Sequence, residues 1–198
     1  MSKTCGLYYL GATVVTREVL ARVQRYSNRV LGIFGLDSKH LAECHVTIVP
    51  PFYADFRIAS RINLSCAAAT LLSEHPLVTT LFFIRGMSVM SFNDIHVLHF
   101  KVGVYNNNEL PDHFTQYVKT LRKKFAECGL LFKEDVPDEF MPHITVHMGK
   151  DIGYDVRLKK IITGSQVERP LYFKSGYPTL YARYKNDWRD LRNDPTTI

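Results

Sequence analysis

Cysteine is scarce in this chain: there are four cysteines in 198 residues, and no two of them have the Cys-x-x-Cys spacing of a zinc or redox motif. This low usage excludes a disulfide scaffold and favours a reducing compartment, so we expect a cytoplasmic protein. Long apolar runs are also absent, because no stretch approaches the roughly eighteen apolar residues of a membrane span. The N-terminal stretch has no clear cleavage pattern of a signal peptide. We therefore expect no membrane partner.

The sequence does contain enough apolar residues for a large core, and it has an excess of positive charge. Hydrophobic residues make up 46% of the chain, which is ample for one large domain or two closely joined lobes. The net charge of +6 favours anionic partners such as nucleotides or nucleic acid. Arg22, Arg25 and Arg29 lie on one side of a predicted helix. Such charges usually form a solvated face, and the alternative is that they steer a polyanionic substrate.

The two halves of the chain repeat one order of predicted elements. Each half has a strand, a long amphipathic helix and then a short β-branched strand. The corresponding elements are the strands 6–13 and 95–102, the helices 16–34 and 111–128, and the short strands 45–49 and 143–148. In the first half, Thr16 is a candidate helix cap, and Gly35 stands where the helix should end. Pro50 and Pro51 are expected to end the first short strand abruptly.

Further elements complete the prediction. Residues 57–74 and 156–162 are weaker helical stretches, and residues 77–84 and 87–90 are expected to form two strands around Arg85 and Gly86. No flexible linker separates the halves. We therefore predict one α+β domain over residues 1–185, with lobes of about 1–92 and 93–185 that are free to exchange strands. A polar tail follows over residues 186–198, with Trp188 and Leu191 as candidate docking points.

Each short strand carries a His-x-Thr motif, formed by His45 and Thr47 in the first half and by His143 and Thr145 in the second. Because side chains alternate along a strand, the His and Thr of one motif share a face, roughly 7 Å apart, while the residues between them point into the core. The internal repeat indicates that the two motifs face each other. Two imidazoles and two hydroxyls around one space suit a phosphodiester.

The chemistry assigns different work to the two residue types. One group must take a proton from the attacking oxygen and another must protonate the departing oxygen, and imidazole does either near neutral pH. The threonines would donate hydrogen bonds to the non-bridging phosphate oxygens. No metal or cofactor is required. A single His-x-Thr is more often structural, whereas two copies at equivalent places favour catalysis, and the order of acid and base stays open.

These motifs resemble those of the 2H phosphoesterases, which carry one His-x-Thr/Ser-x motif in each lobe of a LigT-like fold. Residues 44–52 and 140–146 both look like the family's motif regions, including the proline before the second histidine. The resemblance covers most of the chain. It implies a bilobal, pseudo-symmetric α+β fold in which antiparallel sheets line a central cleft and helices lie outside. It also implies that His45 and His143 are catalytic and that Thr47 and Thr145 bind phosphate.

Residues 122–131 are similar to the eukaryotic and viral branch of that family, which includes the phosphodiesterase domain of A-kinase anchoring protein and viral antagonists of 2′,5′-oligoadenylate signalling. This resemblance implies a 2′,5′-linked oligoadenylate or a 2′,5′-containing cyclic dinucleotide as substrate. RNA ends with a 2′,3′-cyclic phosphate come next. The alternative from another class is a catalytically idle module that binds nucleotides or RNA. We expect a monomer whose partner is a nucleotide or short oligonucleotide, with RNA as a further candidate.

Three aromatic residues flank the motifs in sequence. Phe52 and Tyr53 follow the first motif and Phe140 precedes the second. Rings at these places could stack on a nucleobase, and the alternative is that they seal the core. We carry all three as candidate substrate-binding residues.

The remaining histidines and cysteines give weaker signals. His147 continues the strand alternation after Thr145, so it is a candidate substrate contact on the same face. His143 and His147 would be about 13 Å apart on a strand, too far to share one metal ion, so no metal site is predicted. Cys44 alternates away from His45, which argues against a Cys–His nucleophile. Five histidines have no repeated context and are interpreted as structural: His40, His75, His96, His99 and His113.

Overall fold

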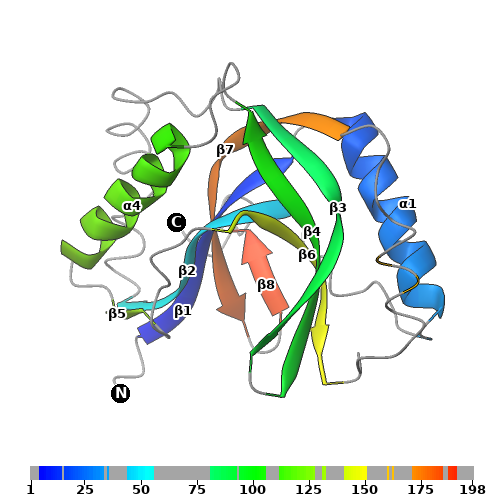
Figure 1. Cartoon of the computed structure of the whole chain (residues 1–198). Helices are drawn as coiled ribbons and strands as arrows, with labels where there is room; N and C mark the ends of the chain where they lie inside the picture. Colours follow the sequence, from blue (N-terminus) through cyan, green and yellow to red (C-terminus); the bar gives the residue numbers. More distant parts are fainter. Residues whose placement is uncertain are drawn as a thin grey trace.

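The protein has an α+β fold, as the sequence predicts (Figure 1). The computed structural model describes residues 5–14, 16–33, 35, 44–55, 81–92, 94–105, 112–127, 131–132, 141–150, 160, 162, 171–184 and 187–190. The strands are β1 (Cys5–Val14), β2 (His45–Asp55), β3 (Leu81–Phe92), β4 (Ile95–Tyr105), β5 (Leu131–Phe132), β6 (His143–Gly149), β7 (Leu171–Tyr184) and β8 (Asp187–Asp190). The helices are α1 (Arg17–Ile33) and α4 (Asp112–Glu127).

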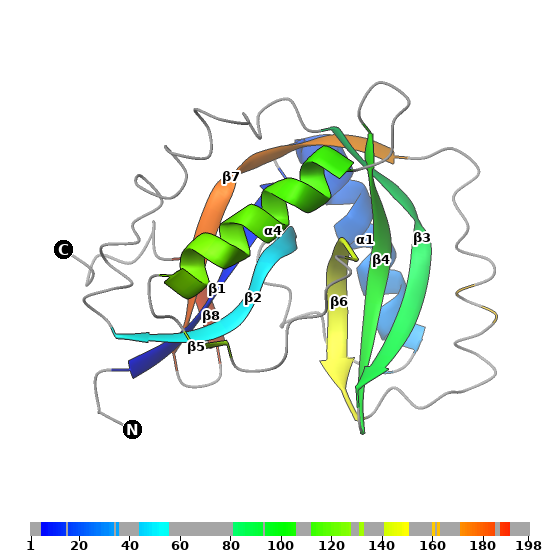
Figure 2. The same ribbon diagram turned by 60° about the vertical axis from the view of Figure 1, so that its left-hand side comes forward.

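The strands form an antiparallel sheet in the order β5-β2-β1-β7-β3-β4-β6. Strand β7 joins its two parts, because residues 171–174 pair with β3 and residues 178–182 pair with β1. The sheet is strongly curled, since β2 and β6 stand near opposite ends of this order and nevertheless contact each other. Figure 2 shows the beginning of β6 beside the beginning of β2. The two His-x-Thr strands are therefore neighbours in space.

Each long helix contacts a strand of the other half of the repeat, and α1 also packs against β1 and β7. Helix α1 follows β1, yet the ring of Tyr26 lies 6.0 Å from that of Phe100 on β4. Helix α4 follows β4, yet Phe125 meets Phe52 of β2 edge to face at 5.4 Å. Figure 1 shows α1 and α4 on opposite sides of the strands. This exchange ties the two halves into one core, and it leaves each motif strand with a helix behind it or behind its neighbour.

The core fixes which way the motif strands face. Val46 and Ile48 of β2 and Ile144 of β6 are fully buried in the main hydrophobic cluster. Burying each such side chain contributes roughly 1.5–3 kcal/mol. A slip by one residue would turn these side chains to solvent and the histidines into the core, so the apolar residues hold the register. The opposite side of the sheet, which carries His45, Thr47, His143 and Thr145, is called the motif face below.

The predicted boundaries of α1 are confirmed. The N–H of Leu20 donates to the carbonyl of Thr16 at 2.9 Å, which closes the first turn. At the other end, Gly35 has φ of 67°, a conformation that glycine adopts without strain, and its N–H donates to the carbonyl of Gly32 at 3.2 Å. Val19, Val23 and Val30 are buried as their spacing predicts.

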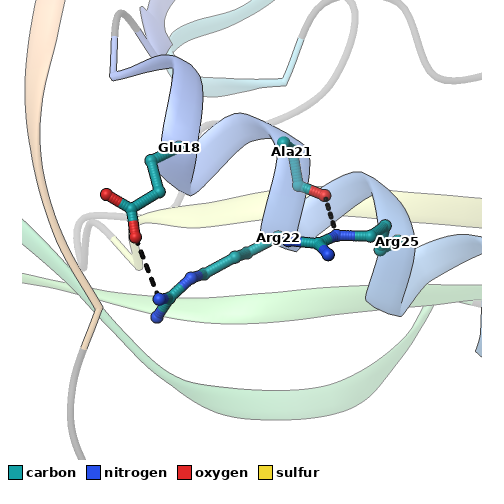
Figure 3. A network of polar contacts seen from close by, with 4 residues as sticks. All are labelled: Glu18, Ala21, Arg22 and Arg25. Atoms are coloured by element: carbon teal, nitrogen blue, oxygen red, sulfur yellow. Dashed lines mark hydrogen bonds and ion pairs between the residues drawn. The ribbon is translucent and has the colours of Figure 1, made fainter.

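The arginines of α1 behave as a solvated face (Figure 3). Arg22 forms an exposed ion pair with Glu18 one turn earlier at 2.9 Å, and the Nε of Arg25 donates to the carbonyl of Ala21 at 3.3 Å. Exposed pairs of this kind contribute only about 0.3–0.5 kcal/mol. Among the described residues, no helix is long and apolar enough to cross a membrane.

The prediction that Pro50 and Pro51 end the first motif strand is wrong, because β2 continues to Asp55. The register passes from Val49 opposite Leu10 to Phe52 opposite Tyr8, with shifts on both sides of Leu10. The two prolines therefore sit at a bulge in the ladder. Proline has no N–H to donate to the neighbouring strand. At a bulge the regular hydrogen bonds are already interrupted, so the strand tolerates the two prolines there.

Residues 81–92 form one strand, so the predicted pair of strands around Arg85 and Gly86 is also wrong. The register with β4 shifts between Ile84 and Gly86, which leaves Arg85 as the extra residue of a bulge. Gly86 has φ of 138°, which L residues rarely adopt. The glycine therefore marks a bulge in a continuous strand, and the true hairpin partner is β4.

The end of the domain lies later than residue 185, because Asp187–Asp190 form β8 against β7, with Trp188 opposite Arg183. Strand β3 falls within the first predicted lobe yet pairs with β4 and β7. The helix predicted over 57–74 lies outside the described residues, as does most of 156–162, of which residues 160 and 162 are helical.

Candidate active site

The first motif stands against a stack of tyrosine rings. The imidazole of His45 lies 4.9 Å from the ring of Tyr9 and 5.0 Å from that of Tyr181, with planes inclined by 29° and 31°. The two tyrosine rings themselves stack at 4.7 Å. Both tyrosines are buried, whereas His45 and Thr47 are only partly buried. The histidine is thus held on an aromatic support and keeps access to the motif face.

Gly11 of β1 makes room for this histidine. Gly11 pairs with Thr47 and lies two residues before Thr13, which pairs with His45. A Cβ atom at residue 11 would lie 2.7 Å from Cδ2 of His45 and 3.2 Å from Cε2 of Tyr181. Any larger residue would displace the imidazole. Glycine is therefore required here by close approach, and it fixes where the His45 ring can lie.

The second motif has its histidine held by the main chain. Nδ1 of His143 lies 2.9 Å from the carbonyl oxygen of Met141. A carbonyl only accepts, so Nδ1 carries the hydrogen and donates it, and Nε2 of the neutral ring keeps its lone pair. Burial lowers the pKa of His143, an effect partly offset by this hydrogen bond. At neutral pH the ring is neutral, with its basic nitrogen free of Met141.

A third histidine belongs to this site, although the sequence reasoning interpreted it as structural. His99 of β4 pairs with Thr145 of β6, and its ring lies 5.3 Å from that of His143 at 69°. Nδ1 of His99 donates to the carbonyl of Val97 at 3.2 Å. The pKa of His99 is lowered to about 4, mainly by burial and to a smaller extent by the neighbouring His143 and Lys101, while the hydrogen bond to Val97 partly offsets the effect. His99 is therefore an uncharged ring that packs against the ring of His143.

Lys101 is the second residue that the sequence reasoning missed. It pairs with His143 across the β4–β6 ladder and is exposed. Directly paired residues point to the same face with Cβ atoms about 4.5–5.5 Å apart. In the part of the chain that the structure describes, no carboxylate forms an ion pair with Lys101. Alternation along β4 would have found both residues, had the pairing of β4 with β6 been predicted.

The site combines these parts because β2 and β6 contact each other (Figure 2). Each motif begins its strand, with His45 as the first residue of β2 and His143 as the first residue of β6. Thr145 is partly buried on the same face as His143, as Thr47 is beside His45. The arrangement offers three imidazoles, one of them the buried ring of His99, with two hydroxyls and one ammonium group on the motif face. The catalytic roles of these residues remain predictions.

The flanking aromatics divide into different environments. Phe52 is fully buried between Tyr8, at 6.1 Å, and Phe125, at 5.4 Å, so it seals the core and cannot stack on a base. Tyr53 is partly buried and pairs with Leu7, which alternates onto the same face as Tyr9. It stays a candidate substrate contact. Phe140 lies outside the described residues.

His147 does not continue the alternation of the second motif. The β4–β6 register passes from His99 opposite Thr145 to Leu98 opposite His147, so Val146 is an extra residue in a bulge. His147 is 8% exposed and shares the face of Leu98, a core residue. The prediction that it lines the motif face is wrong, because the bulge reverses the alternation. Within the described segments, no three His, Cys, Asp or Glu side chains gather to hold a metal ion.

Cys44 is not a nucleophile in this structure. Its side chain is buried in the hydrophobic core, as its position next to His45 predicts from alternation. Burial raises the pKa of the thiol to about 11. A buried thiol that stays protonated lacks the thiolate needed for attack.

Comparison with known proteins gives a distant structural similarity. No protein-family model matches the chain, and no curated protein matches it. Among solved structures, the chain is similar to one described as the crystal structure of a phosphoesterase, with a TM-score of 0.46 and 14% sequence identity over 93% of both chains. A similarity at this level concerns the fold alone.

Proposed function

We propose that this protein is a metal-independent phosphodiesterase that cleaves nucleotide phosphodiesters with His45 and His143 as its acid–base pair. The observation that carries the proposal is the meeting of two strands, each with His and Thr on the motif face and each at the same place in a repeated order of elements. A structural histidine would not need a second copy of its motif beside it.

His143 is the general base in this proposal. Its Nδ1–H is committed to the carbonyl of Met141, so Nε2 is the nitrogen that can accept a proton. Burial lowers its pKa, which keeps the ring neutral at the pH where the reaction runs. Nε2 takes the proton of the attacking water as the new P–O bond forms.

His45 is then the general acid. Its ring lies over the faces of Tyr9 and Tyr181, and an imidazolium in that place gains a cation–π attraction that a neutral ring does not. It gives its proton to the departing oxygen as the P–O bond to that oxygen breaks. The products are a phosphomonoester and an alcohol, and a second proton exchange with water restores both histidines.

The phosphate is held by the hydroxyls of Thr47 and Thr145, which donate to its non-bridging oxygens, and by the ammonium group of Lys101. Charge on those oxygens grows in the transition state, so donors placed there stabilise it more than the ground state. All three residues occupy the motif face next to a histidine. These contacts supply the electrostatic stabilisation without a bound cation.

The substrate we favour is a 2′,5′-linked oligoadenylate or a 2′,5′-containing cyclic dinucleotide. This choice rests on the sequence resemblance around residues 122–131 and on the basic net charge of +6. RNA ends with a 2′,3′-cyclic phosphate are the second candidate substrate. The alternative class is an idle module that binds nucleotides or RNA, and intact His and Thr at all four motif positions argue against it.

Turnover of purified protein tests the proposal directly. The substrates are 2′,5′-diadenylate, a cyclic dinucleotide with one 2′,5′ linkage and a 2′,3′-cyclic nucleotide, each with and without excess EDTA. We expect cleavage of at least one substrate at the same rate with EDTA. Activity that EDTA abolishes and one added metal restores would contradict the mechanism, and binding without any cleavage would favour the idle module.

A further inference from the structure

A pair of aromatic rings lies on the motif face outside the two motifs. Phe83 of β3 pairs with Tyr172 of β7, and their ring centroids are 5.9 Å apart with planes inclined by 44°. Their sequence neighbours Phe82 and Phe173 are buried in the core and stack on each other. By alternation, Phe83 and Tyr172 therefore point to the opposite side, and Tyr172 is 49% exposed. A large aromatic surface is thus offered to solvent there.

An arginine and a glycine shape this aromatic pair. The guanidinium carbon of Arg85 lies 4.7 Å above the centre of the Phe83 ring, and Arg85 is exposed. On β4, a Cβ atom at Gly103 would overlap the Phe83 ring, so the missing side chain lets that ring lie flat against the backbone. Phe83, Arg85 and Tyr172 thus form one amphipathic surface, which we call the aromatic platform.

The aromatic platform is continuous with the candidate active site. Gly103, beneath Phe83, is two residues from Lys101 along β4, and Lys101 pairs with His143 on β6. Phe83 and His143 are separated by two strand spacings of about 4.8 Å across the sheet and by one two-residue step of about 7 Å along β4. On a flat sheet, these two residues would therefore lie roughly 12 Å apart. The curl of the sheet shortens this distance. The span is that of one nucleoside attached to a phosphate held at His143.

The chemistry of the platform fits a nucleobase. Bases stack on tyrosine and phenylalanine rings and on guanidinium planes, whatever their sequence, because every base has a π face. Lys101 stands between the platform and His143, where the phosphate of that nucleoside would lie. Aromatic rings, an exposed guanidinium and an ammonium group in this order match the base and the phosphate of one nucleotide.

We propose that Phe83, Arg85 and Tyr172 form a base-binding subsite for the nucleoside that flanks the scissile phosphate, with Lys101 contacting the phosphate. The proposal rests on the proposed function for the position of the phosphate. These three residues lie far from both motifs in the sequence. The subsite would therefore determine substrate specificity through residues outside the motifs. A substrate without a base on this side would lose the stacking contact.

Calorimetric binding of two probes tests the subsite without any turnover. The probes are adenosine 5′-monophosphate and ribose 5-phosphate, which differ only in the base. We expect the nucleotide to bind wild-type protein about five- to a hundredfold more tightly than the sugar phosphate. Tyr172→Ala should remove most of that difference and leave ribose 5-phosphate binding unchanged, whereas Tyr172→Phe should preserve it. Lys101→Gln should weaken both probes.

Matched controls come from exposed residues far from the motif face. Ile33→Ala removes an apolar side chain that is 48% exposed at the end of α1, and Lys123→Gln removes an exposed cation on α4. Both should bind the two probes as the wild type does. Melting temperatures of all variants establish that each is folded. Equal affinity of the two probes for wild-type protein, or no effect of Tyr172→Ala on their difference, would overturn the subsite.

Turnover separates this proposal from the proposed function. If 2′,5′-diadenylate is cleaved, Tyr172→Ala should raise KM about five- to a hundredfold with little change in kcat, since the ring binds ground and transition states alike. Cleavage with an unchanged KM in this variant would remove the subsite and leave the catalytic proposal. Base-dependent binding in a protein that cleaves none of these substrates would support the subsite and contradict the catalytic proposal.

Discussion

The rings of His99 and His143 meet edge to face, 5.3 Å between centroids and 69° between planes. His99 is buried and hydrogen-bonded to Val97, so it presents a neutral ring to His143. A protonated His99 would stand beside a second imidazole and beside Lys101. The pair therefore favours a site in which both rings are uncharged at neutral pH.

The first prediction concerns stability at acid pH. The folded-state pKa of His99 is lowered to about 4 from an ordinary 6.5, so the unfolded chain binds more protons between these values. The free energy of unfolding therefore keeps its full value above about pH 6.5. It decreases as the pH falls toward 4, by on the order of 3 kcal/mol in all. Urea unfolding at pH 7 and pH 4.5 should show a smaller pH effect in His99→Gln. The same pH effect in both proteins would refute the coupling.

The second prediction concerns the pH dependence of catalysis. If His143 is the base, the acid limb of kcat/KM should fall below the ordinary histidine pKa of 6.5, because burial lowers the pKa of His143 and the neutral form persists to lower pH. His99→Ala should admit water beside His143 and move this limb upward. Rates measured from pH 4 to 9 give both limbs. A wild-type limb above 6.5 would assign the base role elsewhere.

The third prediction concerns the two motif histidines. His45→Ala and His143→Ala should each lower kcat/KM by at least about a hundredfold, and the double variant should be little worse, because the two act on one reaction. The melting temperature should fall by only a few degrees, since both rings are partly exposed. His96→Ala is the matched control, at a hairpin position where the ring contacts Ser91. Additive losses from the two variants would speak against a shared site.

Most of the fold could be predicted from the regular spacing of apolar residues. The spacing of Val19, Val23 and Val30 predicted α1 and its buried side, and alternation predicted that His45 and Thr47 face away from the core. These signals succeed because a helix or strand that buries one side must repeat its apolar residues with the period of its backbone.

Bulges and strand pairing account for what sequence reasoning missed. A bulge adds one residue without changing composition, so the prolines after Val49, the Arg85–Gly86 step and the reversal at His147 gave no periodic signal. Pairing between strands that are distant in sequence also leaves no periodic signal. His99 and Lys101 became site residues only because β4 lies beside β6. Both histidine and lysine also occur commonly on ordinary strand surfaces.

The fourth prediction uses Gly11 to move the general acid without altering it. Gly11→Ala adds a Cβ atom 2.7 Å from Cδ2 of His45, so the imidazole must shift away from its place on the tyrosine rings. We expect kcat to fall about ten- to a hundredfold, because misplacement by about 1 Å can cost a hundredfold. The control is Gly32→Ala in α1, where nothing lies within 4 Å of the new atom. That variant should keep full activity and gain up to about 1 kcal/mol of stability.

The last prediction concerns the linkage that is cleaved. A 2′,5′-linked phosphodiester leaves a free 3′-hydroxyl beside the phosphorus, and a 3′,5′ linkage leaves a free 2′-hydroxyl of similar chemical competence. Any preference must therefore come from how the site seats the ribose and its flanking bases. Tyr53 on one side of the motif face and the aromatic platform on the other are the surfaces that could orient those bases.

We expect faster cleavage of 2′,5′-linked diadenylate than of its 3′,5′ isomer at equal concentration. The two isomers carry the same bases, charge and leaving group, so a difference in kcat/KM reports how the site seats the ribose and the flanking bases. Tyr172→Ala should slow cleavage of the preferred isomer more than that of the other, because stacking helps only the base that the correct ribose aims at the platform. Equal rates, or cleavage confined to 2′,3′-cyclic phosphates, would assign the enzyme to RNA-end processing and leave the roles of His45 and His143 unchanged.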